Sequence, residues 1–186
     1  QWTVSPWTSD TMNDTTKRRA LAKQYIDSAV LYGMDGLNLD VEYDGSVRSK
    51  AWYQEHARLL TLFTCDLRAM IHNLSYVPNS FHLSFASDMR PSVDRFDFKG
   101  LAQCLDFFTP MAYHEPLESL AQGVAQYQSL GVPPSKLVTI FAWFGFDVQC
   151  TNTSGACALK YPHCYAKGTG DGHDCQPGYS TIAHDL

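Results

Sequence analysis

The apolar positions of this chain recur with a helical period in some segments and alternate as in extended strands in others. The helical spacing predicts four helices, at residues 16–32, 47–74, 99–104 and 117–130. Thr15 or Thr16 is expected to cap the first helix and Gly33 to end it, because a hydroxyl side chain can bond free N–H groups of the first turn and glycine stops a helix. Gly131 and two prolines close the last helix.

Strands are predicted between these helices, at residues 35–42, 81–86, 105–113 and 137–143. The alternation of helix and strand indicates parallel strands joined by helical crossovers, and a doubly wound sheet and a (β/α)8 barrel both fit it. No glycine-rich phosphate loop follows a strand, whereas polar residues gather at the carboxyl ends of strands, as in barrel enzymes. A complete barrel takes about 250 residues. We therefore predict an α/β fold that is a partial (β/α)8 TIM barrel.

The first predicted strand carries the most informative pattern. Successive side chains of a strand alternate between two faces, so Asn38, Asp40 and Glu42 share one face and the apolar residues between them share the other. Carboxyl groups on a buried strand cost desolvation energy, and such groups often mark functional sites. The alternative is an edge strand with a solvated face. We expect a buried strand, because its second face is apolar and Gly33 and Gly36 introduce it sharply.

This segment, DGLNLDVE, resembles the active-site strand of the family 18 glycoside hydrolases, whose pattern is Asp-Gly-x-Asp-x-Asp-x-Glu. Asn38 stands where most of the family has Asp, which is similar to the di-N-acetylchitobiase branch. The segments FTPMAYHE (108–115) and KLVTIFAWFGFDVQC (136–150) resemble two further strands of that branch. The resemblance runs from about Thr16 to the end of the chain. It implies that the acidic strand is the fourth of eight and that the chain holds strands four to seven.

The resemblance also implies roles for individual residues. Glu42 is expected to be the general acid that protonates the departing glycosidic oxygen. Asp40 is expected to hold the acetamido N–H of the substrate, to stabilise the oxazolinium intermediate and to keep Glu42 protonated through its own charge. Tyr113 matches the tyrosine that hydrogen-bonds the acetamido carbonyl. The expected substrate-binding residues are Asn38, Met111, His114 and Trp143. His114 replaces a family Asp, and Trp143 is either a sugar-stacking platform or a core residue.

Charge and composition narrow the range of partners. The net charge is −5 and the basic residues form no cluster, which argues against nucleic acid or an anionic membrane surface. No apolar run approaches the roughly 20 residues that a membrane span needs. The family resemblance implies that the partners are oligosaccharides or glycan cores that contain N-acetylglucosamine. We expect a monomer without a cofactor or a metal ion.

Four of the six cysteines are Cys150, Cys157, Cys164 and Cys175, in a loop rich in Gly, Thr, Asp and Pro. They form either disulfides or a zinc site with His163 or His173, and disulfides are favoured because the CxxC spacing of zinc sites is absent. Three N-glycosylation sequons begin at Asn13, Asn73 and Asn152. Together these features predict a protein of the secretory pathway, lysosomal or extracellular.

The activity that the resemblance implies is hydrolysis of β-1,4 N-acetylglucosaminide bonds, in chitooligosaccharides and in the chitobiose core of Asn-linked glycans. The mechanism would be a retaining one in which the acetamido oxygen of the substrate is the nucleophile. We expect exo action by a single incomplete catalytic barrel domain, residues 1–186, with a Cys-rich loop insertion at 149–178. The alternatives are an endo-acting chitinase, a non-catalytic lectin for chitin oligosaccharides on the same scaffold, and an inactive fragment. The presence of Glu42 disfavours the lectin.

Overall fold

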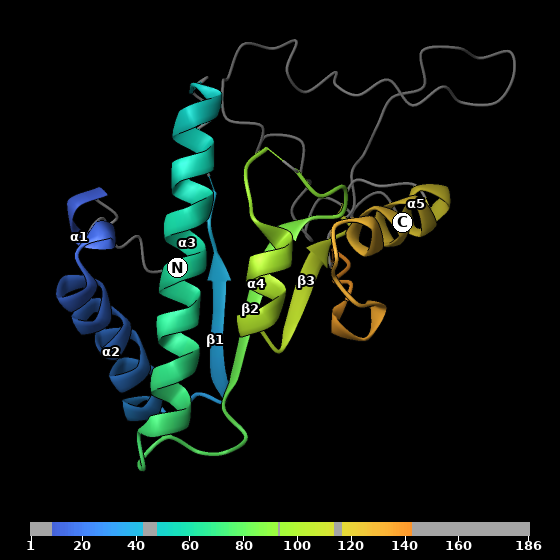
Figure 1. Cartoon of the computed structure of the whole chain (residues 1–186). Coiled ribbons are helices and arrows are strands. Elements are labelled where there is room, and N and C mark those ends of the chain that lie inside the picture. Colours follow the sequence, from blue (N-terminus) through green and yellow to red (C-terminus); the bar gives the residue numbers. More distant parts are fainter. Residues whose placement is uncertain (1–8, 43–47, 93, 114–116, 143–186) are drawn as a thin grey trace, which may run out of the picture. The chain divides into compact units, whose positions relative to one another are not determined.

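The computed structural model describes residues 9–42, 48–92, 94–113 and 117–142 (Figure 1). The chain divides into two compact units, residues 1–141 and 142–186. Every helix and strand described below belongs to the first unit. Among these helices none is both long enough and apolar enough to cross a membrane.

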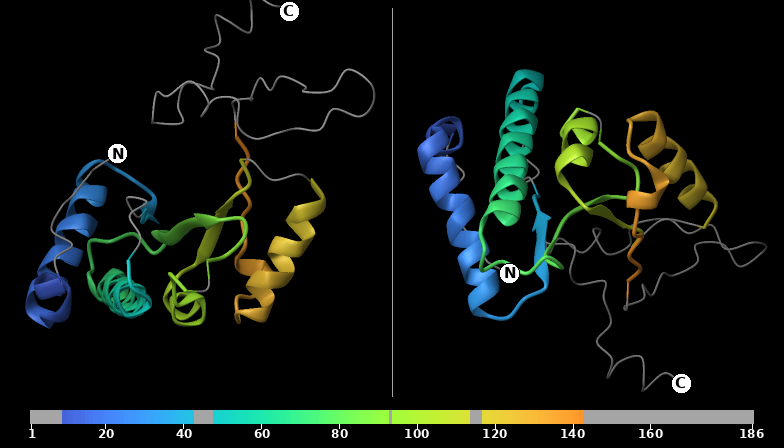
Figure 2. Two further views of the ribbon diagram at one scale, coloured as in Figure 1. Left: turned by 90° about the horizontal axis from the view of Figure 1, so that it is seen from above. Right: turned by 60° about the horizontal axis from the view of Figure 1, so that its bottom comes forward.

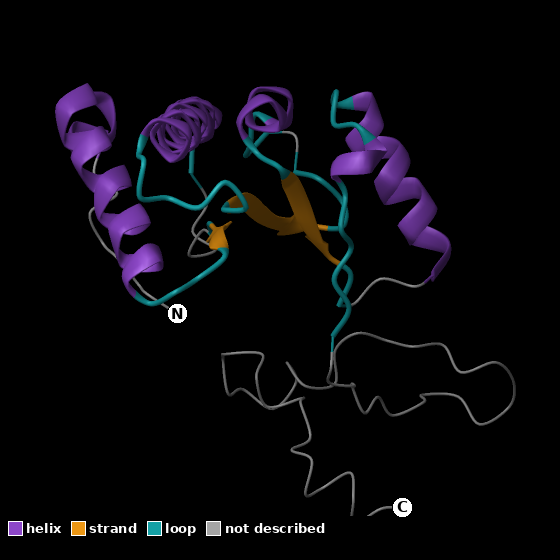
Figure 3. Ribbon diagram, turned by 90° about the horizontal axis from the view of Figure 1, so that it is seen from below, coloured by secondary structure: helices purple, strands orange, loops and turns teal. Residues whose placement is uncertain are grey.

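The first unit is built on an open sheet of three parallel strands in the order β1 (Gly36–Asp40), β2 (His82–Asp88) and β3 (Phe107–Met111). The crossovers between them contain α3 (Lys50–Asn73) and α4 (Phe98–Cys104), while α2 (Thr15–Leu31) precedes β1 and α5 (Leu117–Ser129) follows β3. These four helices lie along one face of the sheet (Figures 2 and 3). The predicted alternation of helix and parallel strand is confirmed.

The ends of the helices follow from local hydrogen bonding. Asp14, not Thr15 or Thr16, caps α2: its Oδ1 accepts the N–H groups of Thr16 at 2.8 Å and Lys17 at 3.0 Å. Gly33, with a φ of 66°, ends that helix as predicted. Two short elements were not predicted, the helix α1 (Ser9–Asn13) and the 3₁₀ turn η1 (Pro134–Lys136).

The core lies between the sheet and the helices. Aromatic rings from β2, β3, α4 and α5 meet there: the Phe108 ring contacts those of Phe85, Phe98 and Tyr127. α3 adds Leu59, Leu60, Phe63 and Leu67, each at most 1% exposed. The helix-facing side of the sheet is therefore a dry, close-packed layer that fixes the strands.

The fourth predicted strand, at 137–143, forms only two isolated parallel bridges with β3. The N–H groups of Val138 and Ile140 donate to the carbonyls of Phe108 (2.9 Å) and Pro110 (3.0 Å), and Ala112 N–H donates to Ile140 O (2.9 Å). A regular parallel ladder would add a bond from the N–H of residue 110 to Val138 O. Proline has no N–H, so the ladder between β3 and this segment is interrupted at Pro110. Of the four predicted strands, the described residues therefore form three as regular strands.

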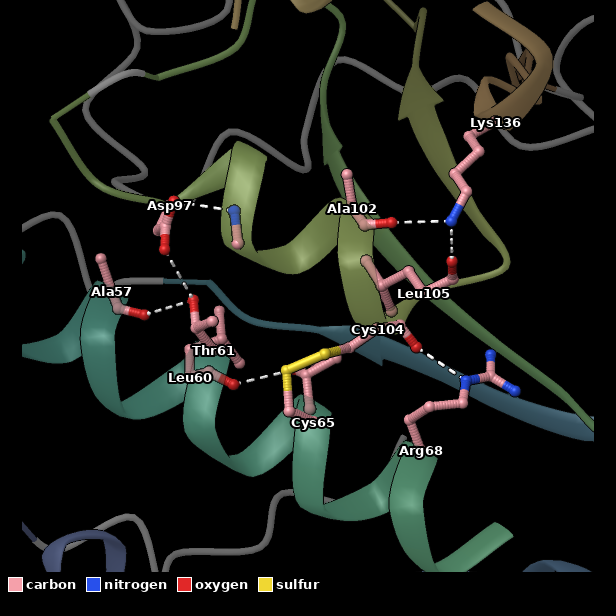
Figure 4. The surroundings of a disulfide bond; sticks show 12 residues. Ala57, Leu60, Thr61, Cys65, Arg68, Asp97, Ala102, Cys104, Leu105 and Lys136 are labelled. Carbon is pink, nitrogen blue, oxygen red and sulfur yellow. Dashed lines mark hydrogen bonds between the residues drawn. A yellow bond between two sulfur atoms is a disulfide. The ribbon is translucent and has the colours of Figure 1, made fainter. Parts of the chain in front are cut away.

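A disulfide between Cys65 of α3 and Cys104 of α4 joins these two crossover helices, with Cα atoms 5.0 Å apart (Figure 4). The sequence did not predict this pair. Arg68 Nε supports it by donating to the Cys104 carbonyl at 2.8 Å. Disulfides are typical of oxidising compartments. The predicted pairing of Cys150, Cys157, Cys164 and Cys175 lies outside the described residues, as does the alternative zinc site.

Candidate active site

The second face of the sheet carries the polar side chains of the strands and no helix among the described residues. On β1, Asn38 and Asp40 alternate with Leu37 and the buried Leu39, so the predicted two-faced pattern is present. On β2 and β3, Ser84 and Thr109 alternate with buried phenylalanines in the same way. Three parallel strands thus bring their polar side chains to one surface.

The register of the strands places these side chains in rows. Asn38 is the partner of Ser84 in the first row. In the next row towards the carboxyl ends, Asp40 is the partner of Ala86, which is in turn the partner of Thr109. Glu42 lies two residues beyond Asp40 and therefore at the carboxyl edge of the sheet, where barrel enzymes carry their chemistry.

A hydrogen-bond network crosses all three strands at Asn38. Its Nδ2 donates to Ser84 Oγ at 2.7 Å on β2 and to Thr109 Oγ1 at 3.1 Å on β3. Both hydroxyls belong to buried residues, 5% and 8% exposed. The Asn38 amide is therefore held in one orientation below the two carboxyl groups.

The expectation that the acidic strand is buried is wrong for its polar face. Asn38, Asp40 and Glu42 are all exposed, whereas only Leu39 is fully buried on the strand. The physical reason is the position of β1 at the edge of the described sheet, with a single neighbouring strand. The alternative considered from the sequence, an edge strand with a solvated face, describes this part of the structure.

The third strand brings two further predicted residues to the same edge. Met111 is the last residue of β3 and the partner of Asp88 in β2, and Tyr113 follows two residues later. Both are half-buried. His114 and Trp143 lie outside the described residues, so their predicted roles remain predictions.

Sequence reasoning missed three residues of this surface: Ser84, Thr109 and Asp88. Asp88 is exposed at the carboxyl end of β2. Tyr127 of α5 fixes that end, because its hydroxyl donates to Asp88 O at 2.6 Å and lies 2.6 Å from Ser87 Oγ. Burial raises the pKa of Tyr127 to about 12, so the phenol keeps its proton. The alternation with buried phenylalanines was a usable signal for Ser84 and Thr109, whereas their alignment with Asn38 required the register.

Two of the predicted glycosylation sequons begin at helix ends. Asn13 ends α1 and Asn73 ends α3, and both are exposed. The side-chain Oδ1 of Asn13 accepts a hydrogen bond from Arg58 Nη2 at 2.6 Å. Asn152 lies outside the described residues. In the described part of the chain no three His, Cys, Asp or Glu side chains are grouped as metal ligands would be.

Comparisons with known proteins show the family and the fold of the chain. Residues 2–177 match the family described as Glycosyl hydrolases family 18. The di-N-acetylchitobiase of Mus musculus is 26% identical over 155 residues, which cover 76% of this chain and 41% of that protein. A chitinase from Bacillus thuringiensis matches with a TM-score of 0.62 and 20% identity, over 93% of this chain and 32% of its own.

A Group II chitinase catalytic domain from Ostrinia furnacalis, solved in complex with penta-N-acetylchitooctaose, matches with a TM-score of 0.61 and 20% identity. The match covers 82% of this chain and 46% of that one. The chain thus spans less than half the length of the relatives that it matches. At this identity the likeness to the solved chitinases shows a shared fold.

Proposed function

Since the chain belongs to glycosyl hydrolase family 18, we propose that its exposed acidic edge is the active site of an N-acetylglucosaminidase that works when a complete barrel surrounds it. The bond cleaved is the β-1,4 linkage between N-acetylglucosamine units. The observation that carries this proposal is the placement of Asn38 and Asp40 on one face of β1, with Glu42 two residues beyond at the carboxyl edge. Met111 ends β3 at the same edge of the parallel sheet, and Tyr113 follows it.

Glu42 is the general acid of the proposed reaction. It lies beyond the end of β1 and is exposed, so a glycosidic oxygen can reach its carboxyl group. Protonation of that oxygen makes the departing sugar a neutral alcohol. Asp40 lies one row deeper, at the end of β1.

The nucleophile is the acetamido oxygen of the substrate, as in the substrate-assisted exceptions among the glycosidases. Its attack on the anomeric carbon breaks the glycosidic bond and forms a cyclic oxazolinium ion, which water then opens with retention. Asp40 accepts the acetamido N–H and balances the positive charge of that ion. The Tyr113 hydroxyl donates to the acetamido oxygen, and Met111 lines the same pocket.

The two open edges of the sheet support the proposal that the chain is the central-to-late part of a barrel, equivalent to strands four to seven. Beside β1, a groove of about 340 Å³ against α2 is lined by Tyr25, Tyr32 and Met34. Tyr32 and Met34 are 64% and 56% exposed, and at the other edge Val138 and Phe141 are 48% and 58% exposed. Large apolar side chains at both edges of one sheet are suited to packing against further strands and helices.

Exo action on chitobiose units, including the core of Asn-linked glycans, is the preferred form of this proposal. It rests on the name of the matched curated relative and on Asn38, since chitobiase-like sequences have an amide at that position. An endo-acting chitinase uses the same chemistry over a longer cleft. The disulfide between Cys65 and Cys104 and the sequons support a lysosomal or extracellular location.

The test is hydrolysis of chitobiose by the protein expressed from its complete reading frame. Glu42→Gln should lower kcat by about 10²–10⁴-fold while sugar binding persists, because glutamine keeps the shape but has no proton to give. Glu55→Gln is the matched control, since Glu55 is an exposed carboxyl on α3, away from the strand edge, and should leave kcat unchanged. Binding of chitobiose without turnover would favour the lectin, and neither binding nor turnover would favour the inactive fragment.

A further inference from the structure

The hydroxyl groups of Ser84 and Thr109 determine which end of the Asn38 side-chain amide faces them. Ser84 Oγ lies 3.4 Å from the carbonyl oxygen of Leu37, and Thr109 Oγ1 lies 3.3 Å from the carbonyl oxygen of Phe85. A carbonyl oxygen can only accept, so each hydroxyl gives its single hydrogen there. Towards Asn38 both hydroxyls are then acceptors. In the structure the NH₂ group of Asn38, and not its carbonyl oxygen, faces them.

Both N–H groups of Asn38 are used in this way, at 2.7 Å on Ser84 and 3.1 Å on Thr109. The free polar atom of the side chain is its carbonyl oxygen, which accepts hydrogen bonds and cannot donate. Asn38 therefore has no hydrogen to offer to a neighbouring carboxylate.

The amide also reaches the level of Asp40. Asp40, Ala86 and Thr109 lie side by side on the three strands, one row nearer the carboxyl edge than Asn38 and Ser84. Because the Asn38 amide donates to Thr109, it extends from its own row to the row of Asp40. Ala86, which lies between Asp40 and Thr109 in that row, has only a methyl side chain and is buried.

The geometry assigns Ser84 and Thr109 as positioning residues that hold both N–H groups of Asn38 away from Asp40, so that the Asp40 oxygens stay free to accept the acetamido N–H of the substrate. The assignment rests on the proposed function. An Asn38 N–H turned towards Asp40 would compete with the acetamido N–H of the substrate for the Asp40 carboxylate, which the oxazolinium ion needs as its counter-ion. The other ionisable groups towards the carboxyl edge of the described sheet are Glu42 on the same segment as Asp40, Asp88 at the end of β2 and Tyr113 beyond β3.

The test compares Thr109→Val, which keeps the shape and removes the acceptor, with Thr109→Ser, which keeps the hydroxyl. In the complete protein, Thr109→Val should lower kcat for chitobiose by about 10- to 100-fold with a smaller change in KM, because the contact tightens as the ion forms. Thr109→Ser should keep wild-type values, and Ser84→Ala and Ser84→Thr should behave as the corresponding pair.

A second measurement does not depend on activity. In protein labelled with ¹⁵N at asparagine, the Asn38 side-chain hydrogens, identified by their loss in Asn38→Asp, should exchange slowly with solvent and become faster in Thr109→Val. Unchanged exchange, or a Thr109→Val enzyme with the kcat of the wild type, would overturn the assignment. Absence of turnover by the wild type in the same assay would instead overturn the proposed function, and the assignment with it.

Discussion

Arg18 of α2 and Asp66 of α3 form an ion pair in the interior of the helix layer, with Nε and Oδ2 2.7 Å apart. The two residues are 6% and 8% exposed. Arg18 also donates to the Met12 carbonyl at 2.7 Å, so the guanidinium ties three helices together. The pair fixes α2, and with it the start of β1, against α3.

Asp66→Ala should therefore destabilise the protein by about 3–5 kcal/mol, because it leaves the Arg18 charge buried without its partner. The free energy of unfolding in urea measures this. Asp27→Ala is the matched control, since the Lys23–Asp27 pair of α2 is about half exposed and its loss should change stability little. Equal effects of the two substitutions would show that Arg18 is not buried in the folded protein.

Gly36 allows β1 to approach β2 closely. A Cβ atom at this position would lie 2.2 Å from the carbonyl oxygen of His82, which is part of the strand backbone and cannot turn away. Gly36→Ala should lower stability by about 1–3 kcal/mol or more and shift Asn38 and Asp40 relative to β2. Gly33→Asn is the comparison, because asparagine tolerates positive φ and nothing lies near its Cβ position. A Gly36→Ala protein as stable as the wild type would contradict the described β1–β2 pairing.

The disulfide between Cys65 and Cys104 spans 39 positions of the sequence. Loop-closure entropy for that separation predicts that Cys65→Ser with Cys104→Ser lowers the free energy of unfolding by about 3–4 kcal/mol. Thermal unfolding with and without reductant measures the same effect in the wild type. Because the bridge joins two helices behind the sheet, kcat at a temperature where both proteins are folded should not change. An identical Tm with reductant would show that this bond is not formed.

Asp106, just before β3, should make the stability depend on pH below its ordinary pKa of 3.8. Burial by itself raises the pKa of Asp106, but the Leu83 N–H at 2.7 Å and the Arg68 guanidinium outweigh it and lower that pKa. A carboxyl group whose pKa is lower in the folded than in the unfolded state stabilises the protein at any pH above its unfolded-state pKa. This stabilisation is lost as the pH falls through the folded-state pKa. Asp106→Asn should therefore flatten the fall of Tm below about pH 4. If the Tm of the wild type and that of the Asp106→Asn variant fell in parallel there, the described pairing would be contradicted.

Alternation and helical spacing predicted most of the first unit, because they follow from which side of each element meets the core. The face shared by Asn38 and Asp40 is an example, as is the end of α2 at Gly33. Pairings between distant residues were not predictable in this way. The Cys65–Cys104 bridge and the bonds from Asn38 to Ser84 and Thr109 depend on how α3 meets α4 and on strand register, which no local pattern encodes. The exposure of Asp40 depends on which strands lie beside β1.

Substrate assistance is tested most directly by comparing chitobiose with cellobiose as substrates of the complete protein. The two disaccharides share the β-1,4 linkage and differ in the acetamido group, which is the nucleophile of the proposed reaction. We expect release of N-acetylglucosamine from chitobiose, abolished in Glu42→Gln, and no measurable hydrolysis of cellobiose. Comparable hydrolysis of both sugars would contradict substrate assistance at Asp40 and Glu42.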